Sequence, residues 1–318
     1  RAVFATETLA LGINMPARTV VLERLEKFNG ETLVSLTPGE YTQLTGRAGR
    51  RGIDAEGHAV VLWRPGTDPA AVAGPASRRT YPLVSSFRPT YNMAINLVCR
   101  WGRQGAAGVL EPSFAHFQDP DAGLGEAFAS ICEVLAHSGY IGADPQEPAV
   151  GGGGQRLRRI YGDRDLLVAL GLDRGAFDGL GPEELAALAG ALVYRGRNAA
   201  AGQPKMPTRA LESAARILTG EWAGLRQLED RHLLRATAEP ESALARPLYV
   251  WACGGGLPSA LEDTGLAAGD FVHWARRAAD LLNQLARARP APQEFGGRCL
   301  AALGLIRRDV VARAVLTD

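Results

Sequence analysis

The sequence has few cysteines and no long apolar run. Its four cysteines, Cys99, Cys132, Cys253 and Cys299, lie far apart and form no C-x-x-C pair or paired Cys/His spacing that could close a tetrahedral zinc site. We therefore expect a reduced, cytoplasmic chain without a metal site. No run approaches the ~20 apolar residues of a membrane span. The first residues also lack the charged and apolar regions of a signal peptide, so we expect no membrane association.

The chain also lacks an excess of charge of either sign. Its 35 basic and 34 acidic residues leave a formal charge of +1, whereas many nucleic-acid binders are strongly basic. Any nucleic-acid binding must then rest on a local channel. Lys27 and Lys205 are the only lysines, so nearly all positive charge is arginine. This bias reflects either a GC-rich genome or a use of arginine in bidentate phosphate contacts.

Two segments that an ATPase needs are missing from the sequence. The 318 residues contain neither a G-x-x-x-x-G-K-[ST] phosphate loop nor a D-E-x-H segment for a metal ion. The glycine run at 151–154 lacks the Lys-Ser/Thr pair that cradles a phosphate, so we interpret it as a flexible linker. This chain alone is therefore predicted to be unable to hydrolyse ATP.

Strand and helix signals alternate in the first 64 residues, which is typical of an α/β fold. Ala2–Ala5 has the pattern of a buried parallel strand, and we interpret Arg1 as a cut because a native domain seldom begins inside such a strand. Thr19–Leu25 and Thr32–Leu36 flank an Asn-Gly turn signal and predict a hairpin. Ala59–Trp63 predicts a further core strand.

A well-marked helix follows the hairpin. Thr37 as N-cap, Pro38 at the first helical position and Glu40 three residues after the cap predict a capping box. We expect Gly49 and Gly52 to end this helix.

The rest of the chain is strongly helical after a Pro/Gly/Ala-rich connection at 65–80. Apolar residues recur at helical spacing, and the last of these helices has an apolar face that we interpret as the core of a packed bundle. The predicted helices include Tyr91–Val98, Phe128–Leu135, Pro182–Val193, Thr208–Leu234 and Asp270–Ala288, with Phe271, Trp274, Ala275, Ala278, Leu282 and Leu285 on the face of the last one.

The strongest chemical signal is the segment QLTGRAGRRG at 43–52. If the helix continues, Arg47 and Arg50 project from one face and can clamp a γ-phosphate, with Gly46 leaving room for close approach of the nucleotide. Two guanidinium groups there would stabilise the charge that develops during phosphoryl transfer. Gln43 can reach the same site or orient water. The alternative is an arginine-rich helix end in solvent.

A second segment, FATETLALGINMP at 4–16, combines a strand, a polar turn and a glycine loop. Thr6 can bind a nucleic-acid phosphate, and Gly12 allows the backbone to approach a ligand closely. Asn14 can bridge to the ribose of a nucleotide or to neighbouring residues of the site. Taken alone, Thr6 or Asn14 would more often cap a helix.

These two segments together resemble helicase motifs. FATETLALGINMPARTVV is similar to motif V, and YTQLTGRAGRRGID to motif VI, of the superkiller-type DExH-box helicases, in particular their bacterial HelY branch. FRPTYNMAINLV at 87–98 and GVLEPSFAHFQ at 108–118 resemble that family's winged-helix domain and the segment after it. Residues 159–169 and 264–288 resemble its helical C-terminal domain, known as DSHCT.

The resemblance implies an α/β part followed by a mostly α part. Residues 1–80 would form the truncated C-terminal half of a second RecA-like domain. Residues 81–155 would form a winged-helix-like module with a linker, and residues 156–318 a DSHCT-like helical bundle.

The resemblance also implies an ATP-dependent RNA helicase that moves 3′ to 5′ along RNA. Its ATP and Mg²⁺ would be held mainly by the first RecA-like domain, which this chain lacks, and Gln43, Arg47 and Arg50 would face that ATP. Thr6 and Gly12 would contact the RNA backbone. The expected partners are RNA, single-stranded or with a 3′ overhang, and the missing N-terminal half of the helicase.

The last long helix matches the bundle helix that contacts single-stranded bases in the family. Arg276 and Arg277 are therefore candidate RNA contacts, and a solvated polar face is the alternative.

Between Gln118 and Phe128, where the family generally inserts a long stalk, only a few residues remain. Two other functions stay open, which are an RNA-binding or scaffold module without ATPase activity and a DNA-repair helicase of the related archaeal type.

Overall fold

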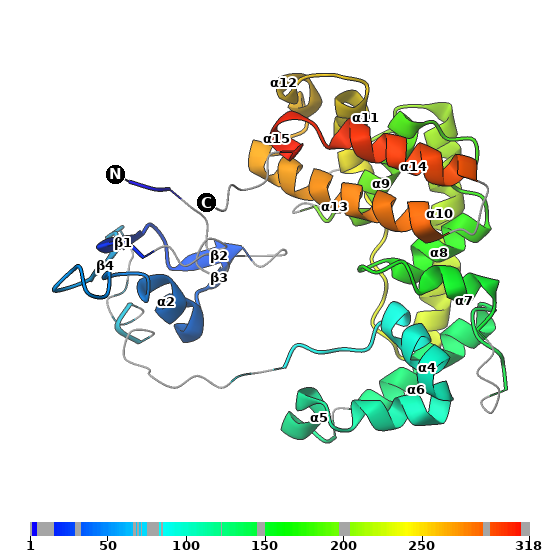
Figure 1. Ribbon diagram of the computed structural model, residues 1–318, viewed down its shortest axis with the longest axis horizontal. Coiled ribbons are helices and arrows are strands. Elements are labelled where there is room, and N and C mark those ends of the chain that lie inside the picture. The colour runs from blue at the N-terminus through cyan, green and yellow to red at the C-terminus, as the bar shows by residue number, and fades with distance from the viewer. Residues whose placement is uncertain are drawn as a thin grey trace. The chain divides into compact units, whose positions relative to one another are not determined.

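The computed structural model describes residues 2–4, 16–28, 33–65, 68, 70, 72–74, 83, 85–121, 123–144, 150–196, 204–288 and 293–312. The described residues up to Leu83 form one compact unit, and those from Ser85 onward form a second. The chain is α/β at its start and mostly α afterwards, which confirms the expected fold class (Figure 1). Within the described part of the chain, no helix is long and apolar enough to cross a lipid bilayer.

The first unit contains two small sheets and a helix. Strand β1 (Thr19–Leu22) pairs in parallel with β4 (His58–Val61), and β2 (Glu26–Phe28) pairs antiparallel with β3 (Leu33–Ser35). The predicted hairpin is present, but its first strand is β2 and not the expected Thr19–Leu25, because Thr19–Leu22 pairs with β4. The turn of the hairpin lies outside the described residues. Helix α2 (Pro38–Thr45) follows β3 directly.

The capping box predicted for α2 is present. The Thr37 hydroxyl accepts a hydrogen bond from the Glu40 backbone N–H at 3.3 Å, and the Glu40 carboxylate accepts one from the Thr37 N–H at 2.8 Å. Lys27 of β2 forms an ion pair with the same carboxylate, which joins the hairpin to the start of the helix. The helix ends at Thr45, and its C-cap Gly46 lies three residues before the expected stop at Gly49.

Two strand predictions in this unit are wrong in part. Residues 2–4 form no strand, and Phe4 is 96% exposed, because no described strand lies beside them to complete their hydrogen bonds. Strand β4 forms as expected but is not a core strand, since Val60 is 42% exposed and Trp63, just beyond the strand, is 69% exposed. A sheet of two strands leaves too little packed against its faces to bury them.

The second unit is built from helices. Its N-terminal part contains α4 (Tyr91–Leu110), α5 (Phe114–Gln118), α6 (Leu124–His137), α7 (Gly152–Leu157) and α8 (Asp165–Asp173). The remainder contains α9 (Pro182–Val193), α10 (Arg209–Arg231), the 3-10 turn η1 (Ser242–Leu244), α11 (Ala245–Ala252), α12 (Leu257–Leu261), α13 (Ala268–Ala288), α14 (Gln293–Ile306) and α15 (Asp309–Ala312).

Helix α9 forms the centre of the bundle. Every residue from Leu185 to Leu192 is buried, and α9 packs against α11, α13 and α14. Figure 1 shows α13 and α14 side by side, and α13 also packs against α9. Five of the six positions predicted on the apolar face of α13 confirm its role as core, since each is 0% exposed: Phe271, Ala275, Ala278, Leu282 and Leu285. The sixth, Trp274, is only partly buried.

Buried polar contacts join α4 to the helices that follow. The Tyr91 hydroxyl donates to the Glu229 carboxylate of α10 at 3.1 Å. The Asn92 backbone N–H donates to the Asp165 carboxylate of α8 at 2.8 Å, and the Asn92 side-chain amide donates to the Leu157 carbonyl at 2.9 Å. The unit from Ser85 onward thus includes both the segment expected as a winged-helix module and the expected bundle, around one apolar core.

The glycine run at 151–154 is not a linker. It forms the N-cap and first turn of α7, and Gly154 is buried against the preceding segment. A Cβ atom on Gly154 would lie 2.4 Å from the Tyr140 carbonyl oxygen and 2.5 Å from Cγ1 of Val150. The linker prediction failed because glycine composition alone does not distinguish a flexible segment from a close helix contact.

Candidate functional site

The arginine segment lies on an irregular loop between α2 and β4. Gln43 is exposed on the last turn of α2, and Arg47 is half-buried in the turn that follows Gly46. Because the helix ends at Thr45, Arg47 and Arg50 do not share a helical face. The expected geometry of a continued helix is therefore wrong, and the backbone of the loop sets the direction of each arginine.

Hydrogen bonds to an earlier strand segment fix this loop. The Ala17 N–H donates to the Arg47 carbonyl at 2.9 Å, and the Gly49 N–H donates to the Ala17 carbonyl at 2.8 Å. Ala17 thereby forms an isolated parallel bridge with Ala48. Since Ala17 belongs to the motif V-like stretch at 4–21, the fold brings part of that stretch beside the arginine loop.

Three glycines allow the close backbone approaches at the loop. Gly49 has φ of +88°, a conformation that residues with a side chain rarely adopt. A Cβ atom on Gly57 would lie 2.5 Å from the carbonyl carbon of Ala48. Position 57, directly before β4, must therefore be glycine for the backbone to run this close to the loop. A Cβ atom on Gly46 would lie 2.8 Å from the Thr42 carbonyl oxygen. Gly57 was not among the residues expected at the site, although its position just before an extended apolar run is a visible signal in the sequence.

Arg50 is held by Asp54. The Asp54 carboxylate accepts hydrogen bonds from Nε of Arg50 at 2.7 Å, from Nη2 at 2.8 Å and from the Arg50 backbone N–H at 3.0 Å. The hydrogen bonds from Arg50 lower the pKa of Asp54 to about 2, and the same contact raises the pKa of Arg50. The Arg50 side chain remains 42% exposed, so a bidentate ion pair orients a guanidinium group that still reaches solvent.

Three residues of the predicted site, Thr6, Gly12 and Asn14, lie outside the described residues.

The two arginines predicted on α13 lie in different surroundings. Nε of Arg276 donates to the Val311 carbonyl at 3.3 Å, and Arg276 is half-buried. Arg277 is exposed, with its guanidinium group 5.4 Å from the ring centre of Trp274 and 3.6 Å from the Asp163 carboxylate. Arg277 is therefore the one of the two that faces solvent.

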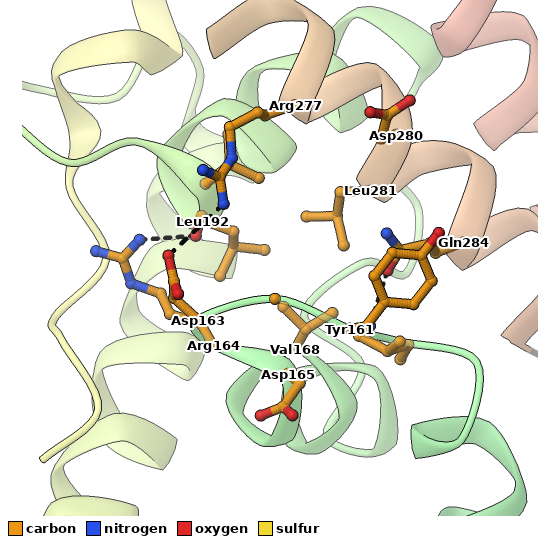
Figure 2. Close-up of a pocket in the computed structure, with 13 residues that line it drawn as sticks. Tyr161, Asp163, Arg164, Asp165, Val168, Leu192, Arg277, Asp280, Leu281 and Gln284 are labelled. Atoms are coloured by element: carbon orange, nitrogen blue, oxygen red, sulfur yellow. Dashed lines mark hydrogen bonds and ion pairs between the residues drawn. The ribbon is translucent and has the colours of Figure 1, made fainter. Parts of the chain in front are cut away.

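Arg277 stands at the rim of a pocket between α13 and the loop before α8. Figure 2 shows Arg277 turned toward Asp163, with Gln284 and Tyr161 on the opposite side of the pocket. The pocket has a volume of about 200 Å³, and Leu281 and Val168 contribute apolar side chains to it. Its lining also includes Ile160, Gly162, Arg164, Asp165, Leu192, Val193 and Asp280.

Arg164, which begins α8, is the buried support of this pocket. Its guanidinium group donates to the carbonyl oxygens of Leu192 at 2.8 Å, Tyr194 at 3.0 Å, Ala238 at 2.9 Å and Glu239 at 2.5 Å. Burial lowers the pKa of Arg164 to about 10. These four bonds fix the end of α9 and the segment before η1 around the pocket.

Asp165 lies next to Arg164, but its carboxyl group points away from the pocket (Figure 2). It accepts hydrogen bonds from the backbone N–H groups of Asn92 at 2.8 Å and Leu166 at 2.7 Å. Burial raises its pKa to about 7. Sequence reasoning did not single out Arg164 or Asp165, although a charged pair directly before an apolar helix is a signal for a buried polar contact.

Comparison with known proteins finds both a matching domain family and longer relatives of the chain. The DSHCT (NUC185) domain family matches residues 148–314. The chain is 30% identical to the probable helicase HelY of Mycobacterium tuberculosis over 539 residues, which cover 98% of this chain and 59% of that protein. It is 31% identical to HelY of Mycobacterium leprae, covering 98% of this chain and 60% of that protein. The exosome RNA helicase MTR4 of Homo sapiens is 42% identical over 118 residues, 37% of this chain and 11% of that protein.

The chain spans about 59% of the length of the mycobacterial protein. The alignment is 539 residues long and this chain has 318, so the mycobacterial protein contains internal segments that have no counterpart here. With the DSHCT match and similarity along nearly its whole length, this chain belongs to the superkiller-type DExH-box helicases and corresponds to the C-terminal portion of such a helicase.

Proposed function

We propose that this chain is the C-terminal part of an ATP-dependent RNA helicase that moves 3′ to 5′ along RNA. The observation that carries the proposal is the arginine loop, in which Asp54 orients the exposed Arg50 guanidinium group and backbone bonds to Ala17 fix the loop. In this proposal Arg47 and Arg50 act as arginine fingers on ATP held by a separate N-terminal half. The name of the human relative, an exosome RNA helicase, supports RNA as the nucleic acid.

The chemistry of the loop fits a γ-phosphate. A guanidinium group that is already oriented loses less conformational entropy when it binds a phosphate. As negative charge develops on the transferred phosphoryl group, the two arginines would stabilise it, and Gln43 on α2 would orient the attacking water. Gly46 and Asn14 would allow close approach of the nucleotide and contact its ribose. Mg²⁺ would accompany the nucleotide in the N-terminal half.

The RNA track would include the motif V-like segment and α13. Thr6 and Gly12 would contact the RNA backbone, and Arg277 would contact RNA next to the pocket shown in Figure 2. The stacked position of its guanidinium group beside Trp274 supports this role, because such a pair offers a nucleotide both a positive charge and a flat surface. Arg276, half-buried and bonded to Val311, would contribute from the same helix.

The test is to supply the missing N-terminal half with Mg-ATP and measure hydrolysis with and without single-stranded RNA. We expect RNA-stimulated hydrolysis, and Arg50→Ala should lower kcat by about 10³-fold or more, as removal of an arginine finger does. RNA affinity should stay nearly unchanged. Arg51→Ala is the matched control, because Arg51 is the exposed neighbour on the same loop and should leave kcat unchanged.

A large loss of RNA affinity with normal hydrolysis in Arg50→Ala would contradict the finger assignment. If the N-terminal half gives no RNA-stimulated hydrolysis, the second candidate applies, which is an RNA-binding or scaffold module without ATPase activity.

A further inference from the structure

A second pocket of the bundle unit lies on α4, away from α13. It is lined by the apolar side chains of Met93, Leu97 and Trp101, by Asn96 and Cys99, and by two arginines, Arg100 and Arg158. Its volume is about 460 Å³, and it is open to solvent. Neither the proposed ATP site nor the proposed RNA track uses any of these residues.

The aromatic side of this pocket is fixed by a break in α4. Gly102 interrupts the helix with φ of 66° and ψ of 175°, a conformation that only glycine adopts readily. The chain turns back so closely that a Cβ atom on Gly105 would lie 3.1 Å from Cβ of Trp101. Trp101 stands at this break and is 43% exposed. The break therefore holds a large aromatic side chain at the surface instead of in the core.

The charged side of the pocket carries two arginines, and none of its described lining residues is a carboxylate. The Arg100 guanidinium group lies 4.5 Å from the ring centre of Trp101. Arg158 donates to two neutral acceptors, the side-chain oxygens of Asn96 at 3.1 Å and of Gln155 at 2.8 Å. Among the residues that the structure describes, neither Arg100 nor Arg158 forms an ion pair, whereas nearby Arg103 pairs with Glu133. Two positive charges beside an exposed indole complement a ligand that is both anionic and flat.

We propose that this pocket, here called the α4 pocket, binds a nucleotide of single-stranded RNA outside the motor track. A base stacks against Trp101, and the adjoining phosphates contact Arg100 and Arg158. Stacking on an aromatic side chain next to arginine is a common way to hold single strands without reading their sequence. The choice of RNA rests on the proposed function, but the site itself does not depend on ATP hydrolysis.

The test measures binding of a short oligouridylate to the full chain without ATP, as a function of salt concentration. Trp101→Ala should weaken binding about tenfold, the effect of losing one base–aromatic stack, with little change in salt dependence. Trp101→Phe should keep most of the affinity. Arg100→Ala and Arg158→Ala should each reduce the slope of log K against log salt by about 0.7, the value for one phosphate contact on a single strand.

Arg209→Ala is the matched control, because Arg209 is an exposed arginine at the start of α10, on a different part of the unit. Thermal unfolding of each variant by circular dichroism separates lost binding from lost folding. If Trp101→Ala binds RNA like the Arg209 control while remaining folded, the proposal is overturned. The proposal is also overturned if an abasic strand binds as tightly as oligouridylate. The same holds if a glutamate-rich peptide binds in a Trp101-dependent way while RNA does not.

The outcome is independent of the ATPase test. Failure of RNA-stimulated hydrolysis together with Trp101-dependent RNA binding would reject the motor function and keep the α4 pocket. Arg50→Ala should leave this binding unchanged.

Discussion

The glycine run that begins α7 provides a sharp test of the bundle structure. In Gly154→Ala, the new methyl group would lie 2.4 Å from the Tyr140 carbonyl oxygen, which is backbone, and 2.5 Å from Cγ1 of Val150. Overpacking a tight contact typically costs about 1–3 kcal/mol, occasionally more. Because one of the two contacts is backbone and cannot rotate away, we expect a loss of about 3 kcal/mol in the free energy of unfolding.

Gly152→Ala is the matched control in the same helix. A Cβ atom there meets only Nη1 of Arg156 at 3.7 Å, and the position is exposed. Replacing an unstrained helical glycine by alanine stabilises a protein by about 0.4–1 kcal/mol, since the unfolded chain loses freedom. The two substitutions should therefore have opposite signs although they lie two residues apart.

Urea unfolding followed by far-ultraviolet circular dichroism measures both changes, because the helices lie mostly in the unit from Ser85 onward. For a unit of this size, a loss of about 3 kcal/mol corresponds to a fall in Tm of roughly 6–12 °C. If Gly154→Ala were as stable as Gly152→Ala, the run would behave as a linker in solution and the close contact would be refuted.

Two buried carboxyl groups give further predictions. Burial raises the pKa of Asp165 from 3.8 to about 7, so between these values the folded chain keeps a proton that the unfolded chain has lost. The stability that protonated Asp165 contributes is present below about pH 4 and is lost as the pH rises toward 7, by roughly 1.4 kcal/mol per pH unit at most. The difference in unfolding free energy between the wild type and Asp165→Asn should therefore depend on pH. Unfolding free energies of the two proteins that stay a constant distance apart over this pH range would contradict the raised pKa. Glu229 is 0% exposed and accepts bonds from the Thr237 N–H at 2.7 Å, the Thr237 hydroxyl at 2.5 Å and the Tyr91 hydroxyl at 3.1 Å. Glu229→Gln should cost about 3 kcal/mol and Tyr91→Phe about 1 kcal/mol in urea unfolding, and equal costs would contradict the assigned network.

The sequence by itself determined the local elements with strong signals. The capping box of Thr37 and Glu40 involves atoms three residues apart, so its hydrogen bonds can be predicted without tertiary contacts. The bounds of α9 agree with the prediction, because Pro182 and the apolar spacing mark it locally. The apolar face of α13 was likewise visible from periodicity. The family was also recognisable from sequence, since motif VI and the DSHCT segment are continuous stretches of chain.

Only the tertiary structure decided how the candidate site is arranged. The end of α2 at Thr45 and the bonds to Ala17 place Arg47 and Arg50 on a loop and not on a helix. These bonds join residues about 30 positions apart, which no local pattern specifies. At Gly154 the sequence predicted a flexible linker where the structure has a buried helix contact, because that contact depends on Tyr140, which lies across a turn.

In the helical bundle, too, some features depend on tertiary contacts that the sequence does not reveal. Asp165 reads as an ordinary acidic residue at the start of a helix, and only packing against distant segments such as Asn92, 73 positions earlier, buries it. This burial raises its pKa. Likewise, the exposed position of Trp101 depends on the break at Gly102. Periodicity and capping act over one or two helical turns and are written in the sequence, whereas burial and charge pairing depend on distant segments meeting, which the folded chain alone determines.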